Sequence, residues 1–151
     1  MSQSPFRHFA PTSRVIYGEG CLDQLAPEIR RMGARRAVVF CGRSLTLANP
    51  GLETVKAALG ELCAGVFTGV VEQSPVTAVE AAVEALRLHA ADAVVVLGGG
   101  SAVVSARAAT ILFGEGKTAQ ELCTVFEPGK PPRSPKVALP KLPQFVIPTT
   151  P

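Results

Sequence analysis

The strongest constraint in this chain is an apolar run that leads through a glycine turn into a second apolar segment, within residues 92–112. The run Ala93 to Leu97 is typical of a strand buried on both faces. Gly98 to Gly100 then turn the chain, and Ser101 to Leu112 has the pattern of a buried helix. Free backbone N–H groups at the start of such a helix attract an anion, and glycines let it approach the backbone closely. We therefore predict a phosphate-bearing ligand at this turn.

The glycine turn alone is not a specific motif. A dinucleotide-binding fingerprint would place a third glycine where Val103 stands, and the GK[ST] ending of a P-loop is absent. Three adjacent glycines also suit a tight turn that lets a helix pack closely on a strand. From the local residues, both interpretations stay open.

Apolar segments with strand and helix patterns alternate on both sides of this turn. Glycines in the segment from Ala64 to Val71 favour a place near a sheet edge. Pro75 suits a first helical turn, and Thr77 with Glu80 matches a capping box. The proline-rich segment 127–143 predicts an extended surface connection. The other predicted strands are Ser13–Tyr17, Arg36–Cys41 and Gln144–Ile147, and the other helices lie within Cys21–Met32, after Asn49-Pro50-Gly51, and after Ser74-Pro75.

This alternation predicts an α/β fold, an open and mostly parallel sheet with helices on both faces. We expect one domain over residues 9–151, preceded by a loose N-terminus at residues 1–8. Ligands of such sheets bind beyond the carboxyl ends of the strands. That rule gathers the ends of three predicted strands at one edge, namely Gly42 to Ser44, Gly98 to Ser101, and Thr149 with Thr150.

Composition and charge exclude several function classes. With 47% hydrophobic and 18% charged residues, the chain can form a core, and its net charge of +3 does not call for nucleic acid as a partner. The arginine pairs at 30–31 and 35–36 are interpreted as solvated helix ends. An apolar run of about 18 residues and an apolar N-terminal segment are both absent, which predicts a cytoplasmic protein that does not insert into membranes.

The cysteine and histidine residues do not form a metal-binding pattern. The four cysteines are far apart and include no CxxC pair, so we expect free thiols in a reducing compartment. His89 lies near a predicted helix end, where a surface or dipole-facing histidine is favoured over a catalytic one. The sequence therefore predicts neither catalytic nor metal-binding residues in this chain.

Three motifs in order resemble the iron-containing (group III) alcohol dehydrogenases of the dehydroquinate synthase-like superfamily. The segment from Pro11 to Leu25 is similar to the opening hairpin and first helix of that family. Ala91 to Ser101 resembles its pyrophosphate loop, and Val146 to Pro151 resembles the cofactor-contacting strand end. The resemblance covers the chain from Phe9 onward and implies a Rossmann-like nucleotide-binding domain.

The resemblance implies a site for a dinucleotide. In this family the glycine turn holds the pyrophosphate, which points to Gly98, Gly99, Gly100 and Ser101, and Thr149 and Thr150 would lie near the nicotinamide half. Family members often carry an Asp after the second strand that binds the adenosine ribose, where this chain has Gly42. Because no carboxylate repels a 2′-phosphate, and Arg43 and Ser44 are adjacent, we expect NADP(H) to be favoured over NAD(H).

The resemblance also implies a divalent metal, iron or zinc, in the complete family enzyme. There, one Asp and usually three His from a separate helical C-terminal domain bind the metal, which polarises the substrate oxygen. This chain ends before any of them, and His8 and His89 match none. We therefore expect that this chain binds no metal, that the helical domain is absent, and that the chain is a truncated product or fragment inactive by itself.

The favoured function is the nucleotide-binding half of an NAD(P)-dependent, metal-assisted alcohol dehydrogenase. Its partners would be the dinucleotide, a small alcohol or aldehyde and, as one option, a second copy in a homodimer. Glycerol dehydrogenase, maleylacetate reductase and dehydroquinate synthase are the nearest alternatives in the superfamily. Two other hypotheses stay open: a stand-alone, non-catalytic dinucleotide- or phosphate-binding module, and an unstable remnant that binds nothing.

Overall fold

A parallel sheet forms the centre of the computed structural model, which describes residues 13–47 and 50–149. Its four strands lie in the order β2-β1-β3-β4, and all three neighbouring pairs are parallel. The α/β prediction is therefore confirmed. The strands are β1 (Ala37–Gly42), β2 (Cys63–Val70), β3 (Ala93–Gly98) and β4 (Gln144–Pro148).

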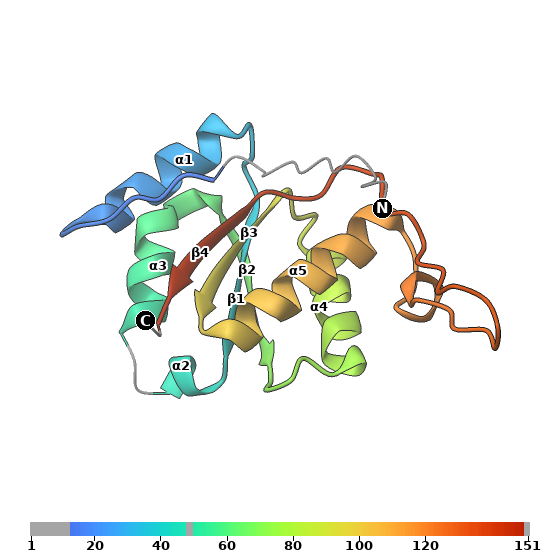
Figure 1. The fold of residues 1–151 in the computed structure, drawn as a ribbon. Helices are drawn as coiled ribbons and strands as arrows, with labels where there is room; N and C mark the ends of the chain where they lie inside the picture. Colours follow the sequence, from blue (N-terminus) through green and yellow to red (C-terminus); the bar gives the residue numbers. More distant parts are fainter. Residues whose placement is uncertain (1–12, 48–49, 150–151) are drawn as a thin grey trace, which may run out of the picture.

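Helices cover both faces of the sheet, as Figure 1 shows, and this layering explains the unbroken apolar runs of the central strands. Successive side chains of a strand point to opposite faces. Val39 and Cys41 accordingly join the core cluster on one face, whereas Val38 and Phe40 join the cluster on the other. Both faces exclude water, so β1 and β3 have no polar alternation.

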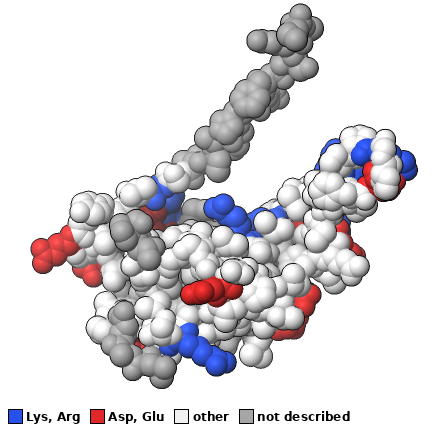
Figure 2. Space-filling model, turned by 60° about the horizontal axis from the view of Figure 1, so that its bottom comes forward, with Lys and Arg blue, Asp and Glu red and all other residues white. Residues whose placement is uncertain are grey.

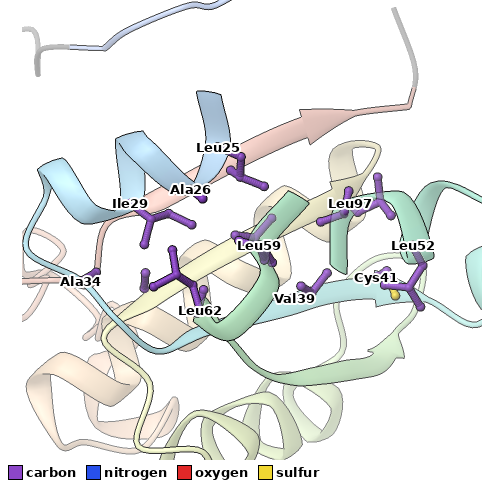
Figure 3. Close-up of a cluster of buried hydrophobic side chains, with 14 residues drawn as sticks. Leu25, Ala26, Ile29, Ala34, Val39, Cys41, Leu52, Leu59, Leu62 and Leu97 are labelled. Carbon is purple, nitrogen blue, oxygen red and sulfur yellow. The ribbon is translucent and has the colours of Figure 1, made fainter. Parts of the chain in front are cut away.

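The first face is covered by α1 (Leu25–Arg31), which follows the short 3-10 helix η1 (Cys21–Gln24), and by α3 (Gly51–Leu59). Figure 3 shows apolar side chains of both helices directed toward those of β1 and β3. Ile29 is 0% and Leu59 1% exposed. Burying such a side chain contributes roughly 1.5–3 kcal/mol, so this cluster holds both helices against the sheet.

The second face is covered by α4 (Val76–Leu88) and α5 (Gly100–Glu115), which contact each other and the sheet. Helix α5 is apolar on most of its circumference because it also meets the returning chain. A Cβ atom on Gly114 would lie 2.8 Å from the carbonyl oxygen of Pro140. Gln144 donates a 2.7 Å hydrogen bond to Thr110, which is fully buried in α5. Helix α5 is thus packed between α4, the sheet and the segment before β4.

Strand β2 lies at an edge of the sheet, as its glycines predicted. Both glycines make room for aromatic rings. A Cβ atom on Gly65 would lie 2.4 Å from the His89 ring, and one on Gly69 would lie 2.6 Å from the Phe67 ring. The same residues that weaken β2 as a strand therefore allow side chains to pack across it.

The proline-rich segment leaves the body of the molecule as a projecting arm, drawn in orange and red in Figure 1. It follows the 3-10 helix η3 (Gln120–Leu122) and has one isolated antiparallel bridge, between Val125 and Arg133. Lys141 forms an ion pair with Glu115 at the end of α5, and the N–H group of Leu139 donates a 3.0 Å hydrogen bond to the same carboxylate. This contact ties the returning arm to the helix that it left.

Two sequence predictions of local structure are wrong. Ser13–Tyr17 is not a strand, because no neighbouring strand pairs with it and Tyr17 is 98% exposed. Helix α4 starts at Val76 after Pro75, so Thr77 stands inside the helix and no side chain caps its start. In addition, the short helix α2 (Ser44–Leu47) was not predicted. None of the helices in the described residues is long and apolar enough to cross a membrane.

Candidate functional site

The sheet register brings the predicted segments to one edge. In the pairing of β1 with β3, Phe40 lies beside Val96, and both strands continue by the same number of residues to Gly42 and Gly98. On the other side of β3, the N–H group of Thr149 donates a 3.3 Å hydrogen bond to the carbonyl of Gly98. The strand ends therefore meet at the carboxyl edge. Thr150 lies outside the described residues.

Gly98 makes the tight turn between β3 and α5. Its φ is +150°, and a Cβ atom there would lie 2.9 Å from the Cβ of Ala102. Any other residue would be both strained and in collision with the first turn of α5. At this position, the close-packing interpretation of the glycine turn applies directly.

The next two glycines leave the start of α5 open. Gly99 precedes the helix in an extended conformation, and its carbonyl accepts hydrogen bonds from Ala102 (3.0 Å) and Val103 (3.3 Å). Within the described part of the chain, no hydrogen bond satisfies the N–H groups of Gly100 and Ser101. A Cβ on Gly100 would meet nothing within 4 Å. Two donors without a protein partner, at the positive end of a 16-residue helix whose first residue is exposed, suit an anion.

The end of β1 carries the segment predicted to select the cofactor. Gly42 does not need to be glycine for steric reasons, since a Cβ there would lie 3.6 Å from the Val70 carbonyl and 3.8 Å from Ser44 Oγ. Arg43 and Ser44 are exposed, and the Arg43 carbonyl accepts hydrogen bonds from both the N–H and the hydroxyl of Thr46. No ion pair involves Arg43 among the described residues. The Arg43 guanidinium and the Ser44 hydroxyl are therefore exposed next to Gly42, the position where family members often carry an Asp.

A residue that the sequence analysis did not select also contacts the site. The hydroxyl of Ser74, in the loop between β2 and α4, donates a 3.1 Å hydrogen bond to the carbonyl of Ser101. The only local sign was a serine before a proline, which is common at helix starts. Proximity to the glycine turn depends on packing between α4 and α5 and is invisible in the sequence.

His89 lies away from the site, at the amino end of the strands. It ends α4, and its ring packs on Gly65, next to the start of β2. Its carbonyl accepts a 2.9 Å hydrogen bond from Arg36. In residues 13–47 and 50–149, no group of three or more His, Cys, Asp or Glu could hold a metal ion. These contacts give His89 a packing role.

The described cysteines are free thiols. Burial raises the pKa of Cys41, which lies inside the core. Burial also raises the pKa of Cys63, although the nearby Gly65 backbone acts in the opposite direction. A raised thiol pKa keeps the sulfur protonated and a poor nucleophile.

The surface near the carboxyl edge is largely uncharged. Figure 2 shows the lower side of the molecule, where Lys and Arg are separated from one another by uncharged residues. An apolar hollow of about 250 Å³ lies between α4 and α5, with Val79, Ile111 and Leu122 among its lining residues. Its walls offer few partners for a charged ligand, unlike the free N–H groups at the glycine turn.

The chain is similar to known proteins over most of its length. Residues 11–151 match the model of the family described as iron-containing alcohol dehydrogenase. Maleylacetate reductase of Rhizobium sp. strain MTP-10005 is 41% identical over 97 residues, which are 64% of this chain and 27% of that enzyme. Its crystal structure superposes with a TM-score of 0.69 at 32% identity, covering 98% of this chain and 34% of that one.

A second relative is an alcohol dehydrogenase. Long-chain-alcohol dehydrogenase 1 of Geobacillus thermodenitrificans is 36% identical over 106 residues, covering 69% of this chain and 26% of that enzyme. The chain thus spans about a third or less of the length of these relatives. The family match extends from before η1 through the glycine turn to the end of β4, so the chain belongs to the iron-containing alcohol dehydrogenase family.

Proposed function

We propose that this chain forms the nucleotide-binding part of an NAD(P)-dependent oxidoreductase. In the complete enzyme, hydride would pass between an alcohol or carbonyl carbon and the nicotinamide ring. The observation that carries the proposal is the pair of N–H groups of Gly100 and Ser101, which have no partner among the described residues and lie at the start of α5. Family membership supports the same class of reaction, since the relatives are named as dehydrogenases and reductases.

The glycine turn would bind the pyrophosphate. Gly98 lets the chain turn directly from β3 into α5, and the amides of Gly100 and Ser101 would donate to phosphate oxygens. The helix dipole favours negative charge at this point, and α5 carries no acidic residue in its first turn. By resemblance to the family, Thr149, whose N–H group is hydrogen-bonded to Gly98, would lie near the nicotinamide half together with Thr150.

The segment Gly42 to Ser44 would bind the adenosine end. Position 42 has room for a Cβ atom, and an Asp there would repel a 2′-phosphate, whereas the glycine does not. The unpaired guanidinium of Arg43 and the hydroxyl of Ser44 would bind that phosphate. We therefore propose NADP(H) as the favoured cofactor.

The cofactor would supply the hydride, and the role of this chain would be to bind and orient it. The described residues do not fit a catalytic metal, so none of the roles proposed for them involves a metal ion. The alcohol or aldehyde that reacts would be selected by other parts of the complete enzyme. Maleylacetate reductases and a long-chain-alcohol dehydrogenase are both among the relatives, so they do not single out one substrate.

Titration of the 151-residue chain with NADPH and with NADH, followed by calorimetry, tests this proposal. We expect NADPH to bind about tenfold or more tightly than NADH, because charge-assisted hydrogen bonds to phosphate are strong. Arg43→Ala should remove most of that difference and leave NADH binding unchanged. A preference for NADH would contradict the assignment of the adenosine end. Binding of neither dinucleotide would contradict the whole proposal.

A further inference from the structure

One side chain supports the glycine turn from outside. In the described part of the chain, the only side-chain hydrogen bond to Gly98–Ser101 comes from Ser74, whose hydroxyl donates to the Ser101 carbonyl at 3.1 Å. No side chain caps the start of α5 itself. The other hydrogen bonds of the turn are made by backbone groups, as at Gly99 and Thr149. Ser74 therefore fixes a segment whose glycines otherwise permit many conformations.

A second serine fixes the orientation of Ser74. The hydroxyl of Ser105 donates a 2.8 Å hydrogen bond to the hydroxyl of Ser74. Ser105 is 1% exposed and lies one helical turn beyond Ser101, on the same side of α5. The Ser74 hydroxyl accepts a hydrogen bond from Ser105 and donates one to Ser101. These two bonds together fix its orientation.

The backbone before α4 takes a rare conformation that presents this hydroxyl. Gln73 has a φ of +61° and Ser74 a φ of +48°, and residues other than glycine seldom adopt such values. Pro75 then returns to φ −59° and directly precedes α4. Left-handed residues of this kind persist where surrounding contacts hold them, and they cluster at functional sites.

We propose that Ser74 is a positioning residue of the dinucleotide site. By anchoring the Ser101 carbonyl, it holds the first turn of α5 so that the amides of Gly100 and Ser101 face the pyrophosphate. This inference rests on the proposed function above. It assigns to the loop between β2 and α4 a role in cofactor affinity that requires no direct contact with the cofactor.

The variant Ser74→Gly separates positioning from general stability. Glycine removes the hydroxyl and also relieves the left-handed conformation, so thermal stability should be unchanged or higher. Affinity for NADPH should nevertheless fall about three- to tenfold, the loss expected when one ordering hydrogen bond is removed. Gln73→Gly is the matched control, because it changes an adjacent left-handed residue in the same loop and leaves the hydroxyl network intact. Ser105→Ala should weaken NADPH binding less than Ser74→Gly, since Ser74 can still donate to Ser101.

Two measurements on the full chain test whether Ser74 positions the start of α5. In the unliganded protein, hydrogen exchange at the amides of Ala102 and Val103, which donate to Gly99, should be faster in Ser74→Gly than in Gln73→Gly. NADPH affinity should fall in the same variant. Equal exchange and equal affinity in the two variants would overturn the inference. If the unaltered chain binds no dinucleotide, the proposed function fails. Faster exchange confined to Ser74→Gly would then still support the anchoring of the helix start.

Discussion

The two ends of the sheet are built differently. At the amino end, the Asp92 carboxylate accepts hydrogen bonds from the N–H groups of Arg35 and Arg36, at 2.7–3.0 Å, and Arg36 also binds the His89 carbonyl. At the carboxyl end, the N–H groups of Gly100 and Ser101 have no partner among the described residues. Satisfied polar groups stabilise the fold, whereas unsatisfied donors are available to a ligand. The comparison separates an end whose polar groups are satisfied within the fold from an end that is a candidate for binding.

The largest effect is expected for Gly98→Ala, which should harm both stability and binding. The alanine would have a φ of +150° and a Cβ 2.9 Å from that of Ala102. Such backbone strain costs about 1–3 kcal/mol, and the collision adds to it. Urea denaturation should show this loss, and NADPH affinity should fall at least about tenfold as the turn shifts. Gly100→Ala is the control for stability, because its Cβ would meet nothing within 4 Å. Unchanged stability in Gly98→Ala would remove the close-packing argument.

The next largest effect is expected for Asp92→Ala, and it should be confined to stability. This change removes the acceptor for the N–H groups of Arg35 and Arg36, and a charged acceptor contributes about 1.5–3 kcal/mol. Urea denaturation should reveal that loss. NADPH affinity, measured under conditions where the variant is folded, should equal that of the unaltered chain. A selective loss of affinity would show that the two ends are coupled.

A smaller effect, on cofactor choice, is expected for Gly42→Asp. A Cβ atom there would lie 3.6 Å from the Val70 carbonyl oxygen, an ordinary contact, so stability should change little. A carboxylate there would repel a 2′-phosphate and accept hydrogen bonds from a 2′-hydroxyl, so the NADPH-to-NADH affinity ratio should fall about tenfold or more. Competitive titration measures that ratio. Gly42→Asn is the uncharged control and should change the ratio less. An unaltered ratio in the Asp variant would exclude this strand end from the adenosine site.

The smallest effect is expected for Glu115→Gln, at the carboxyl end of α5. The hydrogen bond from Lys141 and the backbone donor at Leu139 hold the pKa of Glu115 below its ordinary value. A lowered folded-state pKa stabilises the fold at pH values above the unfolded pKa, near 4.3, and this contribution is lost as the pH falls below it.

The unaltered chain should therefore have a higher melting temperature than Glu115→Gln at pH 7, and the two melting temperatures should converge toward pH 3. Glu72→Gln is the matched control because Glu72 is exposed and the charge change is the same. A difference that stayed constant from pH 7 to pH 3 would contradict this account of the ion pair.

Most of the regular elements could be predicted from local sequence. The run at residues 93–97 became β3, and the prediction for 144–147 differs from β4 by one residue. Apolar runs bounded by glycine or proline determine such elements locally. The prediction was wrong at Ser13–Tyr17. This segment has the composition of a strand, but no neighbouring strand pairs with it. Strand formation needs hydrogen bonds to a neighbour, and composition does not show whether a neighbour exists.

The candidate site was only partly predictable. Glycine, the start of a helix and the end of a strand are visible along the chain, so Gly98 to Ser101 could be selected before the fold was known. The role of Ser74 could not be predicted, because its partner Ser101 lies 27 residues away in the sequence. The same holds at the amino end of the sheet for Asp92, whose partners lie 56 or more residues away. A hydroxyl or carboxylate has a specific role only when a distant backbone group is brought within hydrogen-bonding distance.

The sequence by itself determined the order of strands and helices and the glycine turn, because apolar periodicity and the conformational freedom of glycine are local properties. The sequence also predicted that Gly42, Gly98 and Thr149 share one edge of the sheet. Only the tertiary structure decided that β3 lies between β1 and β4, so that Thr149 bonds to Gly98, and that Ser74 reaches Ser101. Strand register and helix packing set those distances, and both depend on how the whole core closes.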